Sequence, residues 1–120
     1  MFSETLLDHF QHPRHAGELL NATHRAEVSN PVCGDVLHLA VRVESQRIVE
    51  ARFLCRGCTT AIAAASWVTE RLLQDGAEFA GTMTAEKIAA ALGGLPPATF
   101  HGAQLAESGI AKLLAVLGRD

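Results

Sequence analysis

Two of the three cysteines in this 120-residue chain, Cys55 and Cys58, form a compact Cys-x-x-Cys pair. The pair lies in the segment ARFLCRGCTTAIAAAS, between a β-like apolar run and an alanine-rich one. This pattern predicts a strand that ends at the pair and a helix that begins directly after it. A helix N-terminus offers free N–H groups and a partial positive charge, which favour the thiolate form of a cysteine placed there. We therefore expect metal or sulfur chemistry at this corner.

Three further residues with ligand side chains lie near predicted ends of elements. Cys33 and Asp35 belong to the turn-forming run NPVCGD, and His101 lies just before the last apolar helix pattern. Cysteine, histidine and an optional carboxylate suit Zn²⁺ in tetrahedral geometry, or iron held by thiolates. Local spacing does not establish a site, since there is no second Cys-x-x-Cys pair. On residue types alone, a filler role for Cys33 and a turn-forming role for Asp35 explain them equally well.

Three histidines near the N-terminus, His9, His12 and His15, are evenly spaced. Pro13 breaks the helix face that would align them on one metal ion. We therefore interpret them as solvated side chains on a helix end and loop.

The elements that position these residues follow from hydrophobic periodicity and from local breakers. Helices are predicted over residues 4–11, 59–74, 85–92 and 103–117, the third capped by Thr84, and strands over residues 25–30, 36–44 and 48–54. Ser3 is the expected N-cap of the first helix, and Asp75-Gly76 should stop the second. The segment Leu95-Pro96-Pro97 is expected to be extended. Three short strands in a row, the last two forming a hairpin, predict an antiparallel meander with one covered face.

Buried faces are predicted for each of these elements. The expected core side chains are Leu37, Leu39, Val41 and Val43, then Val49, Ala51 and Phe53, then Ala61, Ala65, Val68 and Leu72, and in the last helix Ala106, Ile110, Leu113 and Leu117. Strand alternation puts Cys55 on the same side as Phe53, toward the core. The predicted fold class is α+β, with helices on a three-stranded antiparallel sheet, and residues 1–120 form a single domain.

Composition narrows the function classes. The net charge is −3 and no Lys/Arg run occurs, which argues against nucleic-acid binding. No apolar run approaches the roughly 20 residues of a membrane helix, and the N-terminus lacks the basic region of a signal peptide. An odd cysteine count with one Cys-x-x-Cys pair favours metal or redox chemistry over a disulfide framework. We predict a cytoplasmic protein.

The chain closely resembles the IscU/NifU-type scaffold proteins on which iron–sulfur clusters are assembled. The resemblance rests on the segments FSETLLDHFQHPRHAGEL, NPVCGDVLHLAVRV, ARFLCRGCTTAIAAAS, LPPATFH and LAESGIAKLL. The most specific feature is NPVCGD followed at the family spacing by RGCTTAIAAAS. The resemblance implies a small α+β domain that binds iron and a labile [2Fe–2S] cluster and passes the cluster to apoproteins. It implies a scaffold and not an enzyme, with Zn²⁺ as an occupant of the isolated protein.

The resemblance also assigns the site. The family's ligand cysteines fall on Cys33 and Cys58, its aspartate on Asp35 and its histidine on His101. The family's third cysteine directly follows that histidine, and here the position is Gly102, which cannot bind a metal. Cys55 stands where the family normally has no ligand. Cys55 either replaces the missing thiol or is a small buried residue, so the fourth ligand position is open between Asp35 and Cys55.

Partners follow from the same resemblance. Phe2 and the first helix match a segment that contacts a cysteine desulfurase, the source of sulfur. Leu95-Pro96-Pro97 matches the start of a chaperone-recognition motif, but Ala98-Thr99 departs from it, so we interpret this segment as a rigid spacer before His101.

Two other functions are compatible with the residues. One is a divergent member that binds Zn²⁺ and acts as a regulator or sulfur-relay partner of a desulfurase. The other is a thiol–disulfide or sulfur-transfer catalyst using Cys55 and Cys58. No βαβ thioredoxin-like pattern surrounds the pair, which argues against the catalyst.

Overall fold

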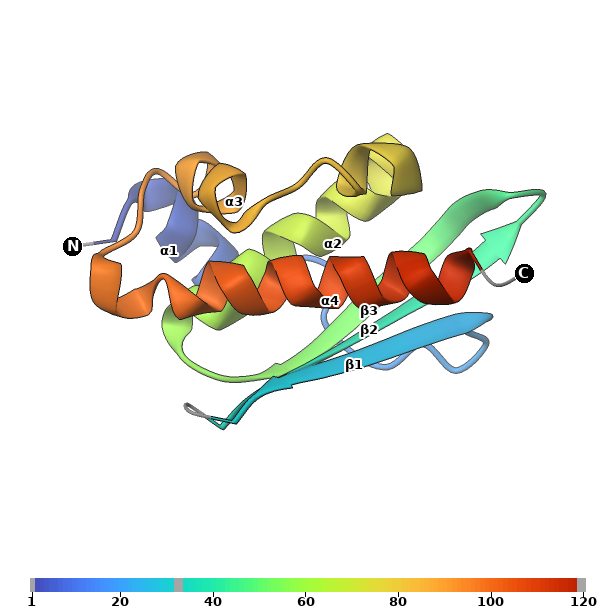
Figure 1. Ribbon diagram of the computed structural model, residues 1–120, viewed down its shortest axis with the longest axis horizontal. Helices are drawn as coiled ribbons and strands as arrows, with labels where there is room; N and C mark the ends of the chain where they lie inside the picture. Colours follow the sequence, from blue (N-terminus) through green and yellow to red (C-terminus); the bar gives the residue numbers. More distant parts are fainter. Residues whose placement is uncertain (1, 32–33, 119–120) are drawn as a thin grey trace.

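A computed structural model of the protein describes residues 2–31 and 34–118. Its strands are β1 (His24–Asn30), β2 (Asp35–Glu44) and β3 (Arg47–Arg56). Its helices are α1 (Glu4–Gln11), α2 (Thr59–Ala80), α3 (Ala85–Ala91) and α4 (His101–Leu117), with a 3₁₀ turn at Pro97–Thr99. The strands form one antiparallel sheet in the order β1-β2-β3 (Figure 1). The α+β class, the meander and the helices on it are therefore confirmed.

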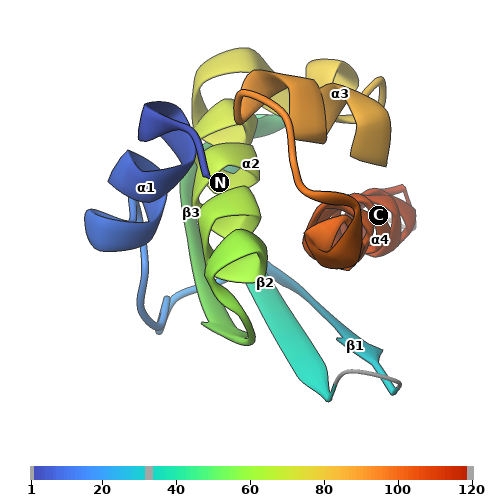
Figure 2. The same cartoon turned by 90° about the vertical axis from the view of Figure 1, so that its left-hand side faces the viewer.

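The helices lie on one face of the sheet. α2 packs along β3 and α4 packs along β1, while α1 and α3 lie against these two helices (Figure 2). Leu37, Leu39 and Val41 of β2 alternate toward this helical layer and are at most 1% exposed. The core is therefore formed between the sheet and the pair α2 and α4.

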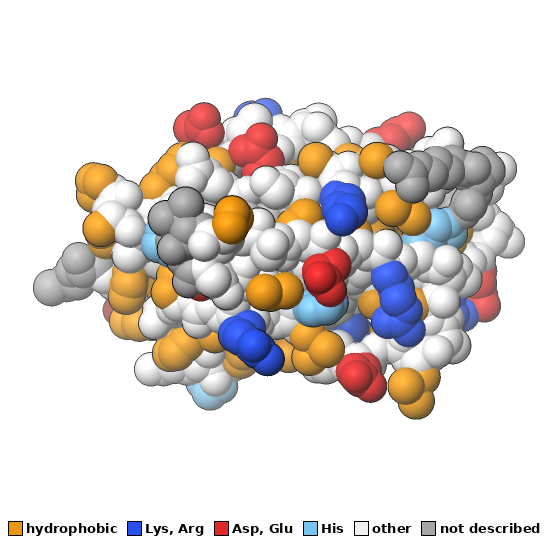
Figure 3. Space-filling view, turned by 60° about the horizontal axis from the view of Figure 1, so that its bottom comes forward, with side chains coloured by type: hydrophobic (Ala, Val, Ile, Leu, Met, Phe, Trp, Pro, Cys, Tyr) orange, Lys and Arg blue, Asp and Glu red, His pale blue; other side chains and the backbone are white. Residues whose placement is uncertain are grey.

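The opposite face of the sheet carries polar side chains. Arg42 of β2 donates from Nε and Nη2 to Glu50 Oε1 on β3, at 3.0 and 2.6 Å. On the side of the molecule shown in Figure 3, basic, acidic and hydrophobic side chains are interspersed. None of the helices in the described part of the chain combines the length and the apolar character needed to cross a bilayer.

The predicted core position of Val49 is wrong, because a β-bulge interrupts the β2–β3 hairpin. Arg42 pairs with Glu50 but Val43 pairs with Ile48, so Val49 is the extra residue. A bulge reverses the alternation of side chains beyond it. Val49 is consequently 38% exposed, while Ile48 packs against the core. Ala51 and Phe53, on the other side of the bulge, are buried as predicted.

The two long helices bury the faces predicted for them, except that Leu117 near the end of α4 is only partly buried, and their bounds differ from the predicted ones. All four predicted core residues of α2 are at most 1% exposed, as are the alanines around them. Gly76, at φ 83°, interrupts α2 where a stop was predicted, and one more helical segment runs to Ala80. α4 begins at His101, two residues earlier than predicted. Pro96 is extended, but Pro97 starts a 3₁₀ turn instead of continuing the extended segment.

The N-terminal region begins with a capped helix and then adds to the edge of the sheet. Ser3 caps α1, since its Oγ accepts a hydrogen bond of 3.0 Å from the Leu6 amide, as predicted. After α1, the chain runs beside the outer edge of β3. Gly17 donates its amide to the Phe53 carbonyl at 2.9 Å, and Phe53 donates its amide to the His15 carbonyl at 3.0 Å. The sequence pattern did not indicate this added edge.

His9 departs from the predicted solvated cluster. It is 6% exposed, and its Nδ1 lies 2.8 Å from Ser66 Oγ on α2. His12 and His15 are exposed, as predicted. His9 follows buried Leu6 by three positions, so both lie on the face of α1 that packs against α2. His9 is therefore part of the contact between α1 and α2.

Candidate metal centre

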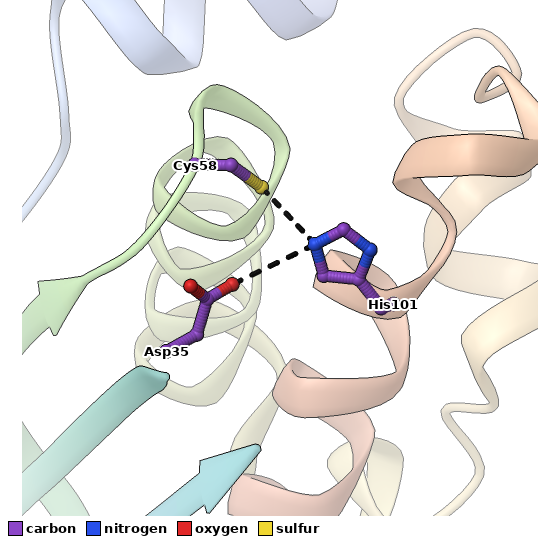
Figure 4. Close-up of side chains that lie close together, drawn as sticks. All are labelled: Asp35, Cys58 and His101. Carbon is purple, nitrogen blue, oxygen red and sulfur yellow. Dashed lines mark hydrogen bonds and ion pairs between the residues drawn. The ribbon is translucent and has the colours of Figure 1, made fainter. Parts of the chain in front are cut away.

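Three of the predicted site residues come together in the folded chain. Asp35, Cys58 and His101 each offer a ligand atom, and these atoms all lie within 4.8 Å of one another (Figure 4). His101 Nε2 lies 3.5 Å from Cys58 Sγ and 3.7 Å from Asp35 Oδ2. The three residues come from the start of β2, the N-cap of α2 and the first residue of α4.

Asp35 faces the interior because it continues the buried side of β2. It pairs with Asn30 across the sheet, it has the same strand parity as Leu37 and Leu39, and it is only 6% exposed. Its Oδ2 is buried and has no hydrogen-bond partner among the described residues. A buried carboxylate oxygen without a donor is costly, so this oxygen is placed to meet a cation or a protonated ring.

Cys58 occupies the N-cap position of α2 in an extended conformation, at φ −74° and ψ 173°. Its sulfur makes no capping hydrogen bond, and the first turn of α2 carries no acidic residue. The free amides of that turn favour a negative charge nearby. Gly57 makes the corner compact, since a Cβ on Gly57 would lie 3.0 Å from Asp35 Cγ. The strand-to-helix corner therefore brings the thiol close to the buried carboxylate.

His101 presents the same nitrogen to both neighbours. Nε2 is the ring atom in both short distances, to the Cys58 sulfur and to the Asp35 oxygen. A proton on Nε2 can serve these two groups, and so can a metal ion placed among the three atoms. Around a tetrahedral ion with ordinary zinc–ligand bonds, ligand atoms lie about 3.3 to 3.8 Å apart. The distances of 3.5 and 3.7 Å fit that requirement.

Cys55 is not a member of this group. It lies opposite Leu37 in the sheet and packs against the core, on the side that strand alternation predicted. Burial, and then the charges of Asp35 and Cys58, raise the pKa of the Cys55 thiol to about 12. The thiolate expected of both cysteines at the corner is thus not favoured at Cys55 in the metal-free protein. Cys33 lies outside the described residues.

Sequence reasoning missed the contacts beneath the site. Thr60 is fully buried in the first turn of α2, and Gly102 is buried in the first turn of α4. A Cβ on Gly102 would lie 2.8 Å from both the amide nitrogen of Ala61 and Cγ2 of Thr60. No local signal in the sequence links residues so far apart along the chain, although a glycine directly after a candidate ligand is a position worth testing for close approach.

The chain is similar in sequence to known proteins over most of its length. Residues 1–116 match the family model described as NifU-like N terminal domain. An iron-sulfur cluster assembly scaffold protein, IscU 1 of Archaeoglobus fulgidus, is 37% identical over 114 residues, which cover 95% of this chain and 74% of that protein. The iron-sulfur cluster assembly scaffold protein IscU of Escherichia coli (strain K12) is 36% identical over 122 residues, which cover 95% of this chain and 91% of that protein.

Two solved structures share the fold. A nitrogen-fixing NifU-like protein (N-terminal) from Brucella abortus superposes with a TM-score of 0.75 at 12% identity, covering 98% of this chain and 94% of that one. A putative iron-sulfur cluster assembly scaffold protein for the SUF system from Fervidobacterium islandicum AW-1 gives a TM-score of 0.67 at 18% identity, covering 97% and 96%. At these identities the likeness concerns the fold alone.

Proposed function

Because this chain belongs to the NifU-like N-terminal domain family, we propose that it is an iron–sulfur cluster assembly scaffold that holds its cargo at Asp35, Cys58 and His101. The cargo is iron and a labile [2Fe–2S] cluster, which the protein passes to apoproteins. In this function the chain binds and releases its cargo and is not itself a catalyst.

The observation that carries the proposal is the convergence of one sulfur, one nitrogen and one oxygen from three separate elements, the oxygen being buried without a hydrogen-bond partner among the described residues. Thiolate and imidazole are ligands that iron accepts readily, whereas a carboxylate oxygen is a harder ligand and binds a soft site more weakly. A site that mixes these donors suits a cargo that must later leave. Asp35 is therefore the ligand we expect to favour transfer.

Loading is coupled to proton release. A metal ion takes Cys58 as thiolate and His101 with a free electron pair on Nε2, so any proton shared among the three groups leaves when the ion binds. The buried Asp35 oxygen, which has no hydrogen-bond partner among the described residues, then gains a cation.

The proposal also includes ligands beyond Asp35, Cys58 and His101. By the family resemblance we assign Cys33 as a further thiolate ligand. Cys55 is the alternative to Asp35 for the fourth position. Its partial burial and raised pKa support a packing role. Replacing Cys55 with serine therefore tests the ligand assignment directly.

A second candidate function is supported by the distances themselves. Two of the distances between the ligand atoms, 3.5 and 3.7 Å from His101 Nε2, are close to those around a single tetrahedral ion, which favours a Zn²⁺-binding family member that regulates a desulfurase or relays its sulfur. The two functions share the ligands and differ in the cargo.

Sulfur for the scaffold would come from a cysteine desulfurase that docks at the N-terminal end of the chain. Leu7 and Phe10 of α1 are 37% and 36% exposed, so this helix presents apolar side chains to a partner.

Anaerobic reconstitution with ferrous iron, cysteine and a desulfurase distinguishes the two functions. A scaffold should develop visible absorption that moves to an added apoferredoxin, and His101→Ala should lose it while the exposed-histidine control His12→Ala keeps it. A colourless protein that retains one zinc ion would support the zinc-binding function and overturn the scaffold.

A further inference from the structure

Gly102 occupies a place that no other residue could fill without movement. It is buried in the first turn of α4, against the first turn of α2. A Cβ there would lie 2.8 Å from the Ala61 nitrogen, 2.8 Å from Thr60 Cγ2 and 2.9 Å from the Thr60 carbonyl carbon. Two of these three atoms belong to the backbone of a helix, which cannot turn aside as a flexible side chain can.

The backbone conformation does not explain the glycine. Unlike Gly76, Gly93 and Gly94, Gly102 does not have a positive φ. Within a helix, glycine is less favourable than alanine by up to about 1 kcal/mol, so conformational preference alone would favour alanine. What the position requires is space, because the two helix ends approach here more closely than a methyl group allows.

This close approach bears directly on the metal centre. Gly102 directly follows His101, and Thr60 lies two residues after Cys58, so the Gly102–Thr60 contact lies beside the Cys58–His101 pair. Bringing a Cβ from 2.8 Å to the roughly 3.5 Å of an ordinary carbon contact requires the two first turns to separate by about 0.7 Å. Metal sites hold their ligand distances to within about 0.2 Å.

We propose that Gly102 is a positioning residue of the metal centre, whose missing side chain sets the distance between His101 and Cys58. This inference rests on the proposed function only in assigning these two side chains to cargo binding. A cysteine at position 102 would therefore move α4 away from α2 before its sulfur could serve as a ligand. Gly102→Cys is therefore expected to disturb the site without adding a ligand.

The test compares Gly102→Ala and Gly102→Cys with Gly109→Ala. Gly109 is a matched control because it is buried in the same helix, and its added Cβ would meet the ends of the Leu37 and Leu39 side chains at 2.8 and 3.3 Å instead of a backbone. Metal-free crystal structures report the Sγ–Nε2 distance. Titration with Co²⁺ reports affinity, and the intensity of its sulfur-to-cobalt charge-transfer band reports the number of bound thiolates.

We expect both Gly102 variants to lengthen the Sγ–Nε2 distance of 3.5 Å by roughly 0.7 Å. Their Co²⁺ affinity should fall about 10- to 100-fold, as for residues that orient metal ligands, with no additional thiolate signal in Gly102→Cys. Gly109→Ala should keep the parent distance and affinity.

Two results would overturn the proposal. One is a Gly102→Ala structure that keeps the parent distance, and the other is a Gly102→Cys protein with higher affinity and one more bound thiolate. If the parent protein itself fails to bind Co²⁺, the proposed function fails, while the distances in the metal-free crystals still decide the role of Gly102.

Discussion

Replacing Asp35 with asparagine should make the metal-free protein more stable and the metal-bound protein less so. The carboxylate is 6% exposed, and its Oδ2 has no hydrogen-bond partner among the described residues. Leaving a buried polar atom unsatisfied costs about 1 to 3 kcal/mol, and more when the atom is charged. The amide has the same shape without the charge, so we expect the free energy of unfolding to rise by about 1 to 2 kcal/mol.

Zinc should reverse this order. A ligand present at 100 times its dissociation constant stabilises the native state by about 2.7 kcal/mol. The asparagine variant loses an anionic ligand and should gain less than the parent from the same zinc concentration. Urea unfolding of the parent and the variant at pH 7.5, first with chelator and then with zinc, measures the change in the free energy of unfolding in both states.

The matched control is Asp75→Asn. Asp75 lies on α2, is partly exposed, and pairs with Arg71 at 3.2 Å. Exposed pairs of this kind contribute about 0 to 1 kcal/mol, so this variant should be neutral or slightly destabilised, with or without zinc. A metal-free Asp35→Asn protein that is less stable than its parent by more than 1 kcal/mol would refute the reasoning, because the carboxylate would then be stabilising the fold through its neighbours.

Three further predictions concern other positions. Cys55→Ser should leave zinc affinity within about twofold of the parent value, and a tenfold loss of affinity would make Cys55 a ligand. Cys55 in the native metal-free protein should be alkylated slowly at pH 8, because a pKa of about 12 keeps the thiol protonated. Val49→Thr should change the free energy of unfolding by less than about 0.5 kcal/mol, since Val49 is the bulged, exposed residue, whereas Phe53→Ala should cost about 3 to 5 kcal/mol in the same urea series. Burial, and then the charge of Arg14, lower the pKa of His9 below its usual 6.5, so the native protein binds fewer protons there than the unfolded chain and loses stability as the pH falls below about 6.5. His9→Asn should therefore reduce the fall in the free energy of unfolding between pH 7 and pH 5, whereas His12→Asn should leave this fall unchanged. The same pH dependence in both variants would contradict the burial argument.

Local patterns in the sequence predict most of the architecture. Ser3 and Thr84 accept the hydrogen bonds expected of N-caps. The stripe of Ala61, Val68 and similar residues predicts the buried face of α2, because the pattern repeats with the helical period and needs no knowledge of the partner surface.

The main errors concern side chains whose burial is set by pairing or packing with another element. Val49 is exposed because it is the extra residue of a β-bulge, which alternation within β3 cannot reveal. His9 is buried because Ser66 supplies a hydrogen-bond partner for its ring. The site was assigned from motif resemblance, whereas the reason for Gly102 became visible only when the two helix ends could be measured against each other.

The segment His15–Gly17 has a consequence for how copies of this protein meet. An open strand edge offers unpaired amides and carbonyls to any other extended chain, and so promotes sheet extension between molecules. Phe53, in the middle of β3, has both its amide and its carbonyl engaged by the protein's own N-terminal segment. The middle of that edge is therefore already occupied by the protein's own chain. Deleting the segment should expose a template for intermolecular β-pairing, so its removal is expected to increase aggregation even if the core remains intact.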